Sequence, residues 1–90
     1  MSVKTYEQMA NILGLPFIRT NLPFSGLPCA VYYTYETGDA TVTATAEQVC
    51  TTVNGKVYSL LDDLNFDTLS ELESIVDDEI LFNGPDEDQE

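Results

Sequence analysis

The fold of this chain is decided between residues 29 and 61, which read CAVYYTYET-GD-ATVTATAEQVCTTV-NG-KVYSLL. β-Branched and aromatic residues are dense throughout this stretch, as is typical of strands. Gly38-Asp39 and Asn54-Gly55 predict two tight turns, because these residue types tolerate the positive φ that short hairpins need. The stretch therefore predicts three strands joined in sequence as an antiparallel meander.

The side-chain pattern along the first hairpin also predicts a register and an irregularity. A turn at Gly38-Asp39 places Tyr33 opposite Ala44, so that large residues face small ones across the two strands. After Ala46, the apolar residues change from even to odd positions. A strand with a period of two cannot make this change without an extra residue, which predicts a β-bulge near Glu47-Gln48.

The segment before these strands has the pattern of a short helix followed by a loop. Thr5 and Gln8 fit a capping box for a helix over residues 5–13, and Gly14 ends it. Residues 15–28 contain three prolines and a glycine, which predict a loop. Its many apolar side chains lead us to expect a lid that lies across one edge of the core.

A second helix is predicted over residues 68–82, where Thr68 and Glu71 fit a capping box and Gly84-Pro85 ends the helix. Its apolar residues fall on one face that packs on the sheet: Leu69, Leu72, Val76 and Ile80. The whole pattern predicts one α+β domain over residues 1–84, in the order αβββα, whose three-stranded antiparallel sheet is packed by two helices. Residues 85–90 are expected to form an acidic disordered tail.

The charge of the chain is strongly one-sided. Its net charge is −13, and twelve of its sixteen acidic residues lie from Asp62 to Glu90, where there is no Lys or Arg. Such a field attracts basic protein surfaces and repels nucleic acids and anionic membranes, so neither is expected as a direct ligand. No apolar run approaches the roughly 18 residues of a membrane span, and the N-terminus lacks an apolar signal core. We therefore expect a cytoplasmic protein of the host cell.

The residue types present argue against catalysis. The chain has no histidine, so it cannot contain a Ser-His or Cys-His pair. The acidic pairs Asp62-Asp63 and Asp77-Asp78 lie in polar runs, whereas acid–base catalysis needs burial to separate carboxyl pKa values. Cys29 and Cys50 are expected to be free thiols in the core. We predict no enzyme activity, no catalytic residue and no cofactor.

One segment has part of the pattern of a calcium site. Asp63, Asn65 and Asp67 match the first three oxygen ligands of an EF-hand loop. Thr68, however, occupies the place of the essential glycine, and Ser74 occupies that of the bidentate glutamate. Acidic residues before a helix also serve as caps, and the capping interpretation is preferred. No metal site is predicted.

The acidic residues of the second helix form the candidate site. At 100° per residue, Asp67, Glu71 and Asp78 fall within about 40° of one another, opposite the apolar face. Uncompensated carboxylates near a helix C-terminus each cost about 0.3–1 kcal/mol, which suggests that they are kept for a partner. The alternative is a solvated face that serves solubility. The predicted partner-binding residues are Asp62, Asp63, Asp67, Glu71, Glu73, Asp77 and Asp78.

A small, strongly acidic, single-domain α+β protein resembles, as a class, the phage-encoded inhibitors that imitate DNA, among them several anti-CRISPR proteins. The resemblance rests on composition and element order, so it assigns no functional residues. It implies a viral inhibitor, monomeric or homodimeric, that binds the basic groove of a nucleic-acid-binding protein. The alternative is a structural, adaptor or virion assembly module. Such a module would bind through apolar surfaces of the sheet and of the loop over residues 17–27.

Overall fold

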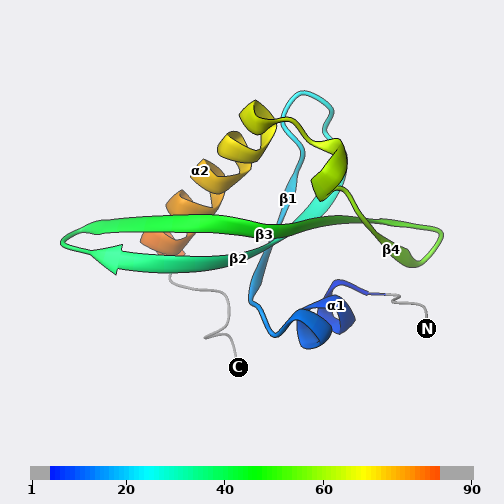
Figure 1. Cartoon of the computed structure of the whole chain (residues 1–90), viewed down its shortest axis with the longest axis horizontal. Coiled ribbons are helices and arrows are strands. Elements are labelled where there is room, and N and C mark those ends of the chain that lie inside the picture. Colours follow the sequence, from blue (N-terminus) through cyan, green and yellow to red (C-terminus); the bar gives the residue numbers. More distant parts are fainter. Residues whose placement is uncertain (1–4, 84–90) are drawn as a thin grey trace.

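The computed structural model describes residues 5–83, and these form one α+β domain. Its strands form a four-stranded antiparallel meander in the order β1-β2-β3-β4 (Figure 1). The expected stop at Gly84-Pro85 and the expected acidic tail lie outside the described residues. The elements follow one another as α1 (Tyr6–Leu13), β1 (Phe17–Asn21), β2 (Pro28–Gly38), β3 (Thr41–Val53), β4 (Lys56–Ser59), a 3₁₀ helix η1 (Leu61–Asp63) and α2 (Phe66–Asn83).

The sheet has one strand more than the sequence pattern predicts, because part of the expected lid is an edge strand. β1 pairs antiparallel with β2, from Phe17 opposite Tyr32 to Asn21 opposite Pro28. Proline cannot donate to a ladder, but Pro16 and Pro23 flank β1 instead of interrupting it. The prediction of a continuous loop over residues 15–28 is therefore wrong, and only residues 15–16 and the turn over residues 22–27 are irregular.

The β2–β3 hairpin turns one residue later than predicted. Gly38 pairs with Thr41, so Asp39 and Ala40 form the turn, and Tyr33 lies opposite Ala46 instead of Ala44. A shift of two residues keeps every side chain on the same face, so the apolar pattern could not detect it. Gly38 is needed for close approach, since a Cβ there would lie 2.8 Å from the Thr41 hydroxyl.

The predicted bulge and second turn are both confirmed. Tyr33 pairs with Ala46 and Tyr32 pairs with Gln48, so Glu47 is the extra residue on β3. Asn54 and Gly55 have φ values of 54° and 78° and join β3 to β4. The bulge lets the apolar residues on both sides of it face the same core.

The two helices cover opposite faces of the sheet, as Figure 1 shows with α2 above it and α1 below. The apolar face predicted for α2 packs on one face of the sheet, with Leu72 and Val76 fully buried against Tyr33 and its neighbours. The apolar residues of α1 pack on the other face of the sheet, around the buried Tyr32. Each fully buried Leu or Val side chain contributes about 1.5–3 kcal/mol, so both helices stabilise the sheet.

The helix N-termini are capped by two different devices. At α1, the predicted capping box of Thr5 and Gln8 is present, and Gly14 adopts φ 70° at the C-terminus. At α2, the side chain of Asn65 accepts a hydrogen bond from the Thr68 N–H at 2.8 Å. The helix therefore starts at Phe66, and the capping box predicted for Thr68 is wrong because Thr68 lies inside the first turn.

The two cysteines are buried free thiols, as expected. Cys29 belongs to the core beneath α2, whereas Cys50 belongs to the core beside α1, so their side chains lie on opposite faces of the sheet. Burial raises the pKa of each thiol to about 11. Both are therefore neutral at physiological pH and poor nucleophiles.

Candidate functional site

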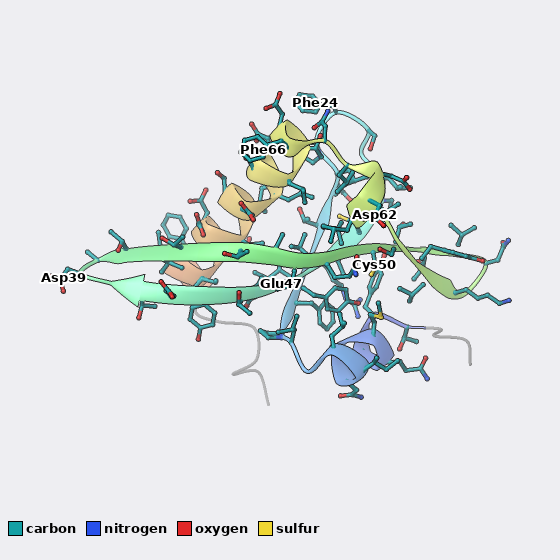
Figure 2. The ribbon with its side chains drawn as sticks, in the orientation of Figure 1. Phe24, Asp39, Glu47, Cys50, Asp62 and Phe66 are labelled. Carbon is teal, nitrogen blue, oxygen red and sulfur yellow. The ribbon has the colours of Figure 1, made fainter. Side chains whose placement is uncertain are left out.

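The seven acidic residues predicted to bind a partner fall into three groups in the structure. Asp62 and Asp63 are exposed on η1, the short helix before α2 (Figure 2). Three exposed residues lie on the side of α2 that faces away from the sheet, and we call them the acidic face: Asp67, Glu71 and Asp78. Glu73 and Asp77 are half-buried between α2 and β3.

Glu73 and Asp77 bind the backbone of the neighbouring strand. The Ala44 N–H donates to Oδ1 of Asp77 at 2.7 Å, and the Ala46 N–H donates to Oε2 of Glu73 at 2.9 Å. Alternate residues of a strand direct their N–H groups to the same edge, and residues four apart lie on one side of a helix. Four residues of helix rise about 6 Å and two residues of strand about 6.8 Å, so the two carboxylates match the two donors.

The N–H groups of Ala44 and Ala46 need partners because β3 forms the edge of the sheet at these residues. β4 pairs with β3 only from Cys50 to Val53, and no other strand in the described part of the chain pairs with the outer edge of β3 at residues 44 and 46. The unpaired N–H and C=O groups of an exposed edge strand can pair with a strand of another chain. Glu73 and Asp77 therefore have a role inside the fold, whereas the acidic face and η1 present their carboxylates to solvent.

Sequence reasoning placed no phenylalanine beside these carboxylates, although Phe24 belongs to the loop over residues 17–27 that the alternative function would use. Phe24, Phe66 and Phe82 are 90%, 79% and 83% exposed, whereas Phe17 packs beside α1. Phe66 and Phe82 belong to α2, and Phe24 lies in the loop between β1 and β2. Figure 2 shows Phe24 and Phe66 at the same end of α2. Phe66 stands outside the apolar stripe of α2, which is the sequence signal that could have revealed its exposure.

Phe24 lies directly beside the acidic face. Phe24 lines a shallow groove together with Asp67, Ser70, Glu71 and Ser74 of α2. The groove thus brings an aromatic residue from one part of the chain near two acidic residues from another. Nothing in the sequence separation of these residues indicates this proximity.

Lys56 is the last basic residue in the sequence, and it precedes the acidic region over residues 62–90. Arg19 forms an ion pair with Glu7, and its guanidinium lies 5.6 Å from the centre of the Tyr6 ring. Arg19 is therefore engaged at α1, on the other face of the sheet. The carboxylates of η1 and α2 consequently create a field of one sign.

The described residues contain neither a metal-binding cluster nor a membrane-spanning helix. Across residues 5–83, no three Asp, Glu, Cys or His side chains come together in a way that could hold a metal ion. Asn65, a residue of the calcium-like pattern, caps α2. No helix within the same residues has the length and apolar character needed to cross a membrane.

Comparisons with known proteins assign no family to the chain. No protein-family model, no curated protein and no solved structure matches it. Its function must therefore be argued from the surface of α2 itself.

Proposed function

We propose that this protein is a small acidic inhibitor that imitates nucleic acid and occupies the basic groove of a nucleic-acid-binding protein. The observation that carries the proposal is the acidic face of α2, where Asp67, Glu71 and Asp78 are all exposed. No Lys or Arg follows Lys56 in the sequence to neutralise them. An inhibitor of this kind needs neither a catalytic residue nor a cofactor.

The spacing of the acidic face supports the proposal. Along the axis of α2, Asp67 and Glu71 are about 6 Å apart, and Glu71 and Asp78 are about 10 Å apart. Phosphates along one strand of B-DNA follow one another every 3.4 Å or so along its axis. The carboxylates therefore match about every second or third phosphate, and a row of Lys and Arg side chains can pair with them.

Glu73 and Asp77 do not enter the proposed contact. Their carboxylates accept hydrogen bonds from β3, so turning them toward a partner would uncover the strand edge. Asp62 and Asp63 on η1 extend the row of charge beyond the N-terminus of α2. The proposed contact surface therefore consists of η1 and the acidic face.

The test compares two charge-reversed variants of equal net charge. Glu71→Lys with Asp78→Lys reverses the acidic face, whereas Glu36→Lys with Glu47→Lys places the same change on the sheet face opposite α2. Glu47 accepts a hydrogen bond from the Thr34 hydroxyl there, and Glu36 follows Thr34 with the same parity. Each protein is used to capture partners from host cytosol at about 0.1 M and about 0.5 M salt, with mass spectrometry of the eluate and displacement by added DNA.

We expect wild type and the opposite-face variant to capture a basic nucleic-acid-binding protein at low salt only, and added DNA to release it. The acidic-face variant should capture none, because electrostatically steered association is lost with the charge. Capture of the same protein by the acidic-face variant would refute the proposal, provided that circular dichroism shows both variants folded.

The alternative function, an adaptor or virion assembly module, is favoured by a different observation. An open groove of about 660 Å³ lies beside the C-terminal end of α1 and β2, and apolar residues that include Leu15, Pro16 and Phe17 line it. A partner that fills this groove would resist high salt, since salt strengthens apolar contacts. Salt-resistant capture of assembly proteins by both charge variants would support this alternative.

A further inference from the structure

The exposed phenylalanines of α2 and the β1–β2 loop are not explained by charge or by solubility. Phe24, Phe66 and Phe82 are each at least 79% exposed. Burying one Phe side chain contributes about 1.5–3 kcal/mol to the free energy of folding. Each of these three exposed rings loses most of that contribution. Phe82 lies about 24 Å along α2 from Phe66, whereas Phe24 and Phe66 lie at the same end of the helix. Exposed apolar groups that gather in one place mark interaction sites.

Phe24 is held in place by its loop at a cost. It adopts φ 72°, a left-handed conformation that costs a side chain other than glycine about 1–2 kcal/mol. Two backbone hydrogen bonds of 2.9 Å close the loop around it, from the Leu22 N–H to the Leu27 carbonyl and from the Gly26 N–H to the Leu22 carbonyl. The loop therefore holds the backbone of Phe24 near Asp67 and Glu71 of α2, and the ring remains exposed there.

A flat apolar ring flanked by two anions has the chemistry of one nucleotide with its neighbouring phosphates. In a duplex the base faces are stacked inside, and proteins contact phosphates and the base edges in the grooves. In a single strand the base faces are open, and proteins bind them by combining a basic groove with aromatic side chains on which bases stack. A surface with both carboxylates and exposed rings matches the second kind of groove better than the first.

We propose that this surface imitates single-stranded nucleic acid, with Phe24 in the place of a base and Asp67 and Glu71 in the place of phosphates. Its partner is a protein whose basic groove carries aromatic stacking side chains. This inference rests on the proposed function, since it specifies which class of nucleic-acid-binding protein the acidic face meets. Phe66 lies at the same end of α2 (Figure 2) but does not line the groove, so the stacking role is assigned to Phe24 alone.

Two synthetic peptides test the surface without knowledge of the natural partner. One alternates Lys and Trp, and the other alternates Lys and Ala at the same length and charge. Both are titrated into the protein by isothermal calorimetry at about 0.05 M salt, where surface charges are weakly screened. The protein contains no Trp, so Trp fluorescence of the first peptide also reports directly on stacking.

We expect wild type to bind the Lys–Trp peptide more tightly than the Lys–Ala peptide, by about fivefold to a hundredfold for each stacked ring. Phe24→Ala should remove this difference and leave binding of the Lys–Ala peptide unchanged. Leu27→Ala is the matched control, because Leu27 is an exposed apolar residue of the same loop that does not line the groove. It should bind both peptides as wild type does.

The two proposals fail in different ways in this experiment. Equal affinity of wild type for both peptides, or a Phe24→Ala variant that still prefers the Lys–Trp peptide, would overturn the imitation of a single strand. Binding of the Lys–Ala peptide that is unchanged by Asp67→Lys with Glu71→Lys would instead remove the electrostatic basis of the proposed function. A Phe24→Gly variant guards against a folding effect, since glycine adopts the φ of this position without strain.

Discussion

Replacing Asp77 with alanine removes a carboxylate that the structure places inside the fold, whereas replacing the adjacent Asp78 removes one that faces solvent. The Ala44 N–H donates to Asp77 at 2.7 Å, in a half-buried position. A hydrogen bond to a charged group contributes about 1.5–3 kcal/mol, and partial exposure to water reduces this value. We therefore expect Asp77→Ala to lower the free energy of unfolding by about 1–2 kcal/mol relative to Asp78→Ala.

The comparison between neighbours isolates the hydrogen bond. Both substitutions remove one negative charge from the last turns of α2, and both exchange Asp for the better helix former Ala. Asp78→Ala should leave stability unchanged or raise it slightly, since Asp78 has no hydrogen-bond partner within residues 5–83. Glu73→Ala and Glu71→Ala form a second pair of the same design, because the Ala46 N–H donates to Glu73 at 2.9 Å and Glu71 lies on the acidic face.

Urea denaturation followed by circular dichroism measures the effect, and thermal unfolding should show a difference of about 4–8 °C for each kcal/mol. Hydrogen exchange adds a local readout, since the Ala44 amide should lose protection in Asp77→Ala and keep it in Asp78→Ala. Equal stability of the two variants, together with equal protection of the Ala44 amide, would refute the assignment of Asp77 to the strand edge.

Two further predictions concern the core and the start of α2. Burial raises the pKa of Cys29 and Cys50 to about 11 from 9.0, so only the unfolded chain ionises near pH 9. Their contribution to stability is complete below pH 9 and lost between pH 9 and about pH 11. Urea midpoints across this range should therefore fall less steeply in a Cys29→Ala, Cys50→Ala variant, and a parallel fall would contradict the burial of the thiols. Asn65→Ala removes the cap on the Thr68 N–H and should cost about 0.5–2 kcal/mol. Thr68→Ala should cost less, and the reverse order in urea denaturation would show that Thr68 is the cap.

Local patterns predicted much of the fold because they involve residues that are close in sequence. The Asn54-Gly55 turn, the extra residue at Glu47 and the α1 capping box each depend on fewer than ten neighbouring residues. β1 was not predicted because its five residues are too few to show a period. The register of the β2–β3 hairpin was also predicted wrongly. An alternating pattern determines which face of the sheet a side chain lies on, but not which residue lies opposite it.

The sequence by itself determined the charge of this protein, the absence of histidine chemistry and the two faces of α2, because these follow from composition and from the helical period. The helical period already turns Glu73 and Asp77 away from the acidic face. Only the tertiary structure gave them partners, since their role depends on where β4 stops and leaves the edge of β3 unpaired. It also placed Phe24 beside Asp67 and Glu71, across more than forty residues of sequence. Helical periodicity tells which side chains point away from the core, but what they meet there depends on how the distant parts of the chain pack.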